Sequence, residues 1–335
     1  MKIGLSGIKP LKSSWSEFKE IATLADKLGY SCISIGESWG EDAFTGLSQV
    51  AAVTSTIKVG TGIVPTFGRS PANLSMAALS LDSISDGRFF LGLGSSGKIV
   101  IEDFHGEEYS KPLTRMREYI EFIKLAAQSE RLNMNGEFVK TQRFKIKFKP
   151  YRNTLPIYIA SLTPKSLELT GEIADGWLPI FFALDRMDKS FESLTKGLQR
   201  SNRTIENITI SAQVATYVTN DIESAFDAER KHMAFYIGGM GTFYHQYMHR
   251  IGFGNQADKI RTAYINKNRE QAAQLVTDEM VSSTSIIGSP ESCANQMEKF
   301  FSNGVDEIRL VLNNVADSNS FKDNLTQLAP YIKGK

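Results

Sequence analysis

The chain has 335 residues, of which 41% are hydrophobic and 22% charged, proportions typical of a folded globular protein. The 38 basic and 37 acidic residues nearly cancel, so charge gives no reason to expect binding to nucleic acid or to an anionic membrane. Two cysteines, Cys32 and Cys293, are too few for a disulfide framework or a four-cysteine zinc site, and we expect both to be buried fillers. Without an apolar leader or spanning run, we expect a soluble, cytoplasmic protein.

Short apolar runs alternate with helical patterns along the whole chain. The runs predict strands at Lys2–Ser6, Ser31–Ile35, Ile57–Ile63, Arg88–Leu93, Leu155–Ala160, Asp175–Leu178, Ile208–Val218 and Val305–Leu312. The patterns predict helices at Ser16–Leu28, Ala43–Thr54, Pro71–Ile84, Met116–Gln128, Pro164–Gly171, Leu184–Gln199, Asp221–Ile237 and Ser320–Ile332. Strands this apolar are buried on both faces, as in a parallel sheet that helices cover.

Eight strand–helix units in a chain of this length favour an α/β fold of the TIM (β/α)8 barrel type. A doubly wound open sheet is the structural alternative. We interpret residues 1–335 as a single domain, with insertions near 95–112, 136–150 and 238–287. The last insertion predicts extra helices around Phe243–Gly254 and Lys259–Met280.

The segment Gly92–Gly97 has the G-x-G-x-x-G spacing of a dinucleotide-binding turn. It follows the fourth predicted strand rather than the first, and no clear amphipathic helix follows it, so the context for NAD is missing. A Gly/Ser loop that touches a phosphate or a flavin-like ring fits better, and a plain tight turn is the alternative.

The histidines of His245–His249 are four residues apart, which places both imidazoles on one helix face, as in a zinc motif. Gln246 stands where that motif has its glutamate, and only His232 offers a third ligand. Histidines on the surface of a Tyr-rich helix explain the spacing adequately. We therefore expect no metal.

Polar residues follow the ends of predicted strands, where TIM-barrel active sites lie. Glu37 follows the second strand, and burial beside Trp39 would suit it to proton transfer. The alternative is a solvated loop whose Asp42 caps the next helix. Thr163 and Lys165 follow the fifth strand at a helix N-terminus and offer an anion site, unless Thr163 is only the cap.

Four segments resemble the bacterial-luciferase-like family, and most closely its coenzyme F420-dependent branch, which includes methylenetetrahydromethanopterin reductase. They are Glu37–Thr45 (ESWGEDAFT), Lys58–Pro71 (KVGTGIVPTFGRSP), Ser85–Gly97 (SDGRFFLGLGSSG) and Ala174–Trp177 (ADGW). The resemblance runs from Lys2 to about Ala183 and resumes at Ser285–Glu291. It implies a TIM barrel, in agreement with the strand count.

The resemblance also implies that a deazaflavin lies across the C-terminal ends of the strands. In relatives a non-prolyl cis peptide backs the ring, and the matching pair here is Gly62–Ile63. The catalytic assignment goes to Glu37 and Ser38, which stand where many F420 enzymes carry Asp-His. The residues assigned to cofactor binding are Trp39, Gly62, Ile63, Val64, Gly94, Ser95, Ser96, Gly97, Ser161, Leu162, Thr163, Pro164 and Lys165.

The sequence thus predicts an F420-dependent oxidoreductase that transfers a hydride between the deazaflavin C5 and an organic substrate, such as methylenetetrahydromethanopterin or a similar small molecule. The alternatives are an FMN-dependent monooxygenase of the same fold and a non-catalytic flavin- or deazaflavin-binding protein. Relatives are commonly dimers, which implies a homodimer or a higher homo-oligomer. The aromatic stretch Phe243–Phe253 is predicted to cover the active-site mouth or a subunit interface.

Overall fold

A computed structural model describes residues 1–8, 13–313 and 315–333 of the chain. Within these residues, parallel strands close into an eight-stranded TIM barrel, as predicted, because β9 and β10 pair and join the two ends of the sheet. The barrel strands are β1 (Ile3–Ser6), β2 (Cys32–Ile35), β3 (Lys58–Thr61) with its continuation β4 (Val64–Pro65), β5 (Phe89–Gly94), β8 (Ile157–Ile159), β9 (Gly176–Trp177), β10 (Thr209–Val218) and β12 (Glu307–Leu312).

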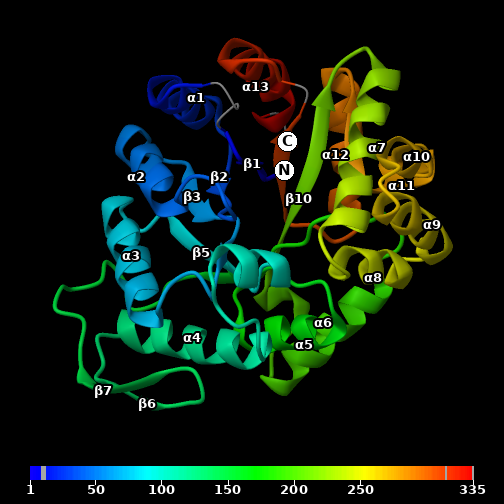
Figure 1. Ribbon diagram of the computed structural model, residues 1–335. Coiled ribbons are helices and arrows are strands. Elements are labelled where there is room, and N and C mark those ends of the chain that lie inside the picture. The colour runs from blue at the N-terminus through cyan, green and yellow to red at the C-terminus, as the bar shows by residue number, and fades with distance from the viewer. Residues whose placement is uncertain (9–12, 314, 334–335) are drawn as a thin grey trace.

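Helices surround the barrel on its outside (Figure 1). Those of the βα units are α1 (Trp15–Leu28), α2 (Ala43–Val53), α3 (Pro71–Ile84), α4 (Pro112–Ala127), α5 (Pro164–Ile173), α6 (Asp188–Arg200), α7 (Ile222–Gly239), α12 (Pro290–Ser302) and α13 (Ser318–Lys333). A short 3-10 helix, η2 (Ile205–Asn207), precedes β10.

Local side-chain chemistry fixes where several helices begin. The Ser14 hydroxyl accepts a hydrogen bond from the Glu17 amide, and the Glu17 carboxylate accepts one from the Ser14 amide, which is a capping box. Asp42 caps α2 by accepting from the Thr45 amide at 2.7 Å, as the sequence predicted. The proline at the first position of α3 needs no backbone partner there.

The strand predicted at Ile57–Ile63 is interrupted, because β3 ends at Thr61 and β4 begins at Val64. A second difference is β11 (Ser285–Gly288), a fully buried strand that pairs with the C-terminal part of β10 and lies within the segment we assigned to an insertion. The hairpin of β6 (Leu132–Asn135) and β7 (Lys140–Phe144) starts earlier than the predicted insertion at 136–150 and lies beside α4 (Figure 1).

The prediction of a single helix around Lys259–Met280 is wrong. The structure divides this region into α9 (Gly254–Ile265), α10 (Arg269–Gln274) and α11 (Asp278–Thr284), which follow α8 (Phe243–Arg250). Two side-chain caps explain the breaks: Asn268 accepts from the Gln271 amide, and Thr277 accepts from the Met280 amide. These helices lie beside α7 in Figure 1.

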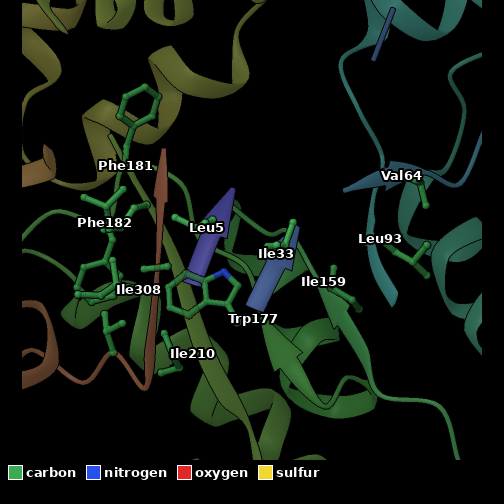
Figure 2. Packing of buried hydrophobic residues seen from close by; sticks show 14 of the residues in the cluster. Leu5, Ile33, Val64, Leu93, Ile159, Trp177, Phe181, Phe182, Ile210 and Ile308 are labelled. Carbon is green, nitrogen blue, oxygen red and sulfur yellow. The ribbon is translucent and has the colours of Figure 1, made fainter. Parts of the chain in front are cut away.

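The hydrophobic core lies between the barrel strands and the helices that surround them. Leu5, Ile33, Ile210 and Ile308 come from four barrel strands and are buried together with Trp177 of β9 (Figure 2). The Trp177 indole donates to the Ser161 carbonyl at 3.0 Å, which satisfies its one polar group. No helix in the described part of the chain combines the length and apolar character that crossing a membrane requires.

Candidate active site

The C-terminal ends of the parallel strands form one rim of the barrel, and most of the predicted site residues lie on it. The register places Ser34 beside Gly60, and Val64 beside Leu93, so the loops after β2, β3 and β5 are neighbours. The Thr61 hydroxyl donates to the Gly92 carbonyl at 2.7 Å and accepts from its amide at 2.8 Å. This pair of bonds fixes β3 against β5 directly below the rim.

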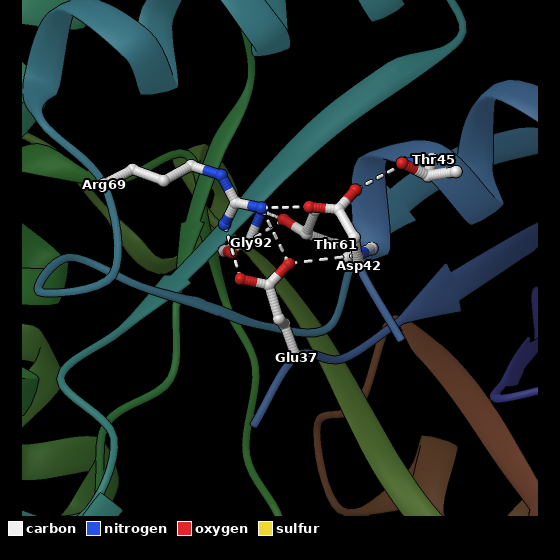
Figure 3. A network of polar contacts seen from close by, with 7 residues as sticks. Glu37, Asp42, Thr45, Thr61, Arg69 and Gly92 are labelled. Atoms are coloured by element: carbon white, nitrogen blue, oxygen red, sulfur yellow. Dashed lines mark hydrogen bonds and ion pairs between the residues drawn. The ribbon is translucent and has the colours of Figure 1, made fainter. Parts of the chain in front are cut away.

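Glu37 is the centre of a charged network on this rim (Figure 3). Its carboxylate accepts two hydrogen bonds from the Arg69 guanidinium, one of them at 3.0 Å, and a third from the Ala43 amide at 3.0 Å. Arg69 also donates to Asp42. The side chains of Glu37 and Arg69 are 11% and 16% exposed, so the pair is largely shielded from water while Asp42 is half exposed.

The surroundings of Glu37 differ from the expected ones. Trp39, which was expected to bury Glu37, is 57% exposed, and Ser38 is exposed as well. Arg69 covers Glu37 instead, and this arginine was missed as a site residue although it lies in the quoted segment Lys58–Pro71. Burial opposes the charge on Arg69, but the hydrogen bonds and charges of Glu37 and Asp42 outweigh it and raise the pKa of the guanidinium.

The peptide bond between Gly62 and Ile63 is cis, which confirms the prediction. Both residues are partly exposed at the rim. The Ile63 carbonyl accepts from the Glu37 amide, and the Gly62 amide donates to the Ile35 carbonyl, each at 2.8 Å. The backbone that carries Glu37 is therefore bonded directly to the Gly62–Ile63 segment.

The loop after β5 also lies on the rim. Ser95, Ser96 and Gly97 are partly exposed there, and Gly94 presents no side chain beside Ile63. The Tyr109 hydroxyl donates to the Ser95 hydroxyl at 3.1 Å.

The loop after β8 follows the strand next to β5, and its assignment to cofactor binding stays a prediction. The buried Ser161 hydroxyl bonds to Thr170 and to the Ser166 carbonyl, so it is directed into α5. Thr163 caps α5 by accepting from the Ser166 amide, which confirms the alternative interpretation of that residue. Pro164 and Lys165 are exposed at the start of α5.

Helix α8 reaches this rim from the large insertion. The guanidinium of Arg250 donates to the Leu162 carbonyl at 2.9 Å, in the loop after β8. At the other end of the helix, the Phe243 ring lies 6.4 Å from that of Tyr109, the partner of Ser95. This agrees with the prediction that Phe243–Phe253 covers the mouth of the active site. The alternative, that this stretch forms a subunit interface, stays a prediction.

The sequence profile of the family described as luciferase-like monooxygenase matches residues 3–307. The chain belongs to the luciferase-like monooxygenase family. Over 327 residues, 91% of this chain and 93% of the relative, it is 31% identical to a putative coenzyme F420-dependent oxidoreductase of Mycobacterium tuberculosis. It is 28% identical over 314 residues, 92% of each protein, to 5,10-methylenetetrahydromethanopterin reductase of Archaeoglobus fulgidus.

Among solved structures, this luciferase-like chain is similar to the coenzyme F420-dependent tetrahydromethanopterin reductase of Methanopyrus kandleri. The TM-score is 0.83, with 22% identity, and the likeness covers 99% of this chain and 100% of that one. At this identity the likeness establishes the shared barrel.

Two arginines of this luciferase-like barrel were missed because their surroundings are not visible in sequence. Burial lowers the pKa of Arg250, whose Nε has no hydrogen-bond partner, and only a tertiary contact places it at the rim. Arg309 is a lone cation in the apolar strand β12 and is fully buried inside the barrel. Burial also lowers its pKa, and it donates to Ser34 and Ser211. An arginine between the apolar strand residues Ile308 and Leu310 was a signal that sequence reasoning could have used.

Arg309 supports the rim from below. A Cβ atom on Gly62 would lie 2.7 Å from the Arg309 guanidinium and 3.0 Å from the Ser34 hydroxyl, so only a glycine leaves room for this contact. The structure thus brings together Glu37, Gly62, Ile63, Gly94 and Ser95, and it directs the Ser161 hydroxyl into α5.

Proposed function

We propose that the protein is a coenzyme F420-dependent oxidoreductase that transfers a hydride between the deazaflavin C5 and a small organic substrate. Methylenetetrahydromethanopterin or a similar molecule is the proposed substrate class. The observation that carries the proposal is the 31% identity, over 91% of the chain, to a protein named as a putative coenzyme F420-dependent oxidoreductase. The position of Glu37 on the C-terminal rim supports it, because TIM-barrel active sites lie on that face.

The shape of the rim suits a flat ring. Gly62 and Ile63 present partly exposed backbone, and Gly94 lies so close to Ile63 that an added Cβ would be 2.7 Å from the isoleucine Cδ1. Glycine lets a ligand approach the backbone closely. In this proposal Gly62, Ile63 and Gly94 support one face of the ring, and Trp39 lies at its open edge. Val64, also assigned to the cofactor from the sequence, is fully buried in the hydrophobic core.

Hydroxyl groups and a cation suit the anionic tail of such a cofactor. Ser95, Ser96 and Gly97 are partly exposed on one side of the rim. Arg250 lies at the loop after the neighbouring strand β8, and the orphaned Nε of its half-buried guanidinium leaves one donor unsatisfied. A partly buried cation gains from an anionic partner, so Arg250 is a better candidate for the tail than the exposed Lys165.

When bound, the deazaflavin supplies or accepts the hydride at its C5, and the protein supplies position and electrostatics. Glu37 would orient the substrate or hold a proton at a carboxylate oxygen. Arg69 fixes the direction of that carboxylate through two hydrogen bonds, as a positioning residue. Ser38, exposed beside Glu37, would contact substrate from the solvent side.

Single-turnover hydride transfer tests the proposal. The protein is mixed with reduced F420 and candidate substrates that contain an iminium, carbonyl or activated alkene group, and the return of oxidised F420 absorbance is followed. Substrate-dependent oxidation of F420 is the expected result. Tight F420 binding without oxidation by any member of the panel would favour the non-catalytic alternative.

A second candidate is an FMN-dependent monooxygenase, because the matching family is described as luciferase-like monooxygenase. Reduced FMN and the same panel would then give oxygen consumption coupled to substrate, which the F420 proposal does not predict. Oxygen uptake that depends on substrate would make this the better assignment.

A further inference from the structure

Three side chains of the insertion converge on one point away from the Glu37 network. His245 and His249 lie one turn apart on α8, and Asp258 lies on α9. The Nε2 atoms of the two imidazoles are 2.7 Å and 2.9 Å from the same Asp258 oxygen, Oδ1. One potential ligand atom from each residue therefore lies within 4.8 Å of the others.

The local fold orients these groups. Residues four apart on a helix share a face, so the spacing of the two histidines directs both imidazoles toward α9. The two rings are 4.9 Å apart at an interplanar angle of 71°. Gly254, the first residue of α9, leaves room for His249, because an added Cβ would lie 2.4 Å from the imidazole Nδ1.

We propose that His245, His249 and Asp258 form a binding site for a divalent transition-metal cation of the zinc class. Two imidazole nitrogens and one carboxylate oxygen are ligands that Zn²⁺ accepts. Three protein ligands leave a fourth coordination position for water. A cation that replaces the imidazole protons would sit among the same three atoms, with little rearrangement of either helix.

The remaining sequence-based candidate for a third ligand does not take part. His232 bonds through Nδ1 to Glu229 of its own helix, at 3.2 Å, and it packs against the ring of Tyr236. This is an ordinary pair of one imidazole and one carboxylate. Asp258, which no spacing rule connects to His245, supplies the third group instead.

A cation here would cross-link α8 to α9. Helix α8 also donates from Tyr247 to the Phe181 carbonyl and from Arg250 to the Leu162 carbonyl. The site would therefore fix the helix that borders the mouth of the barrel, and its role would be structural. It rests on different residues from the proposed F420 site, so either proposal can fail without the other.

Metal titration of the untagged full-length chain tests the site. Zn²⁺ binding is measured by isothermal calorimetry, and Co²⁺ binding by its visible d–d absorption, with Mg²⁺ as a cation that disfavours imidazole. The variants are His249→Gln and Asp258→Asn, both at exposed positions, and the matched control is His232→Gln. Circular dichroism and the thermal midpoint of each metal-free variant report whether it is folded.

We expect one Zn²⁺ or Co²⁺ per chain and no competition from equimolar Mg²⁺. Loss of one ligand should weaken binding by about tenfold or more in His249→Gln and in Asp258→Asn, and His232→Gln should bind like the unmodified chain. Zn²⁺ should also raise the thermal midpoint of the unmodified chain and not that of the two ligand variants. Absence of binding to the unmodified chain, or equal binding by all four proteins, would overturn the site.

Discussion

The rim around Glu37 and the insertion helices α8–α11 are held together in different ways. At the rim, strand register and backbone bonds place the groups: the Glu37 amide donates to the Ile63 carbonyl, and Thr61 ties β3 to β5. In the insertion, side chains that lie on different helices meet, such as His245 and Asp258. A substitution at the rim should therefore change the reaction or the stability of the barrel. A substitution in the insertion should change local stability and ligand affinity.

The largest expected effect is that of Gly92→Ala, a substitution within the barrel strand β5. The new Cβ would lie 2.0 Å from the Thr61 carbonyl oxygen and 2.8 Å from Leu178, and a backbone atom cannot move aside without breaking the register. We expect a loss of about 3 kcal/mol or more in the free energy of unfolding, measured by urea denaturation. Gly40→Ala, where nothing lies within 4 Å of the new Cβ, should change it by less than about 0.5 kcal/mol. Equal effects of the two would show that the contact of β3 with β5 is not rigid.

Glu37→Gln keeps the shape of the side chain and removes its charge. We expect kcat with F420 to fall by on the order of 10²-fold, the usual size of an acid–base or charge-orienting contribution, with cofactor affinity little changed. Glu41→Gln, an exposed position on the same loop, is the control for a general effect of lost charge. Near-normal turnover of Glu37→Gln would show that Glu37 has no catalytic role and is only a loop residue bound to Arg69.

Arg250→Met tests the contact between the insertion helix α8 and the rim of the barrel. We expect F420 to bind about tenfold more weakly, a change of about 1.4 kcal/mol, because the anionic tail would lose its half-buried cationic partner. Arg203→Met is the control, since Arg203 also donates to a carbonyl, that of Gly171, but precedes β10 at the opposite end of the barrel. Unchanged affinity in both variants would remove Arg250 from the proposed cofactor site.

The smallest expected effect is that of Tyr247→Phe, a substitution in the insertion helix α8. The buried Tyr247 hydroxyl donates to the Phe181 carbonyl at 3.0 Å, so its removal leaves that carbonyl without its partner. We expect a loss of about 1 kcal/mol in the free energy of unfolding, with F420 affinity maintained. A drop in affinity as large as that of Arg250→Met would mean that α8 must be fixed in place for the cofactor to bind.

The barrel was predictable because its strands are short apolar runs that alternate with helical patterns, and several of the helices carry a side-chain cap. Pro71–Ile84 was predicted to the residue, since proline marks its first turn. The strand β11 was missed because it follows α11 directly, with no turn to separate its apolar run from the helix. The insertion was predicted as two helices, and the caps Asn268 and Thr277 divide it further, a local signal that was present and not used.

The candidate site was predictable where a residue follows a strand end, as Glu37 does. It was not predictable where a partner comes from another loop. Arg69 is 32 residues from Glu37, and Arg250 is 88 residues from Leu162. The resemblance to F420 enzymes supplied the assignment of Gly62–Ile63, and no property of those two residues alone would have done so. Position after a strand did not reveal that the Ser161 hydroxyl is directed into α5, and the assignment of Ser161 to the cofactor stays a prediction.

Cofactor titration tests the central claim most directly. Quenching of intrinsic tryptophan fluorescence, with Trp39 at the proposed ring edge, would be followed while F420 and FMN are added to separate samples of the same preparation. The account predicts a dissociation constant for F420 well below that for FMN. An FMN dissociation constant equal to or lower than that for F420 would contradict it.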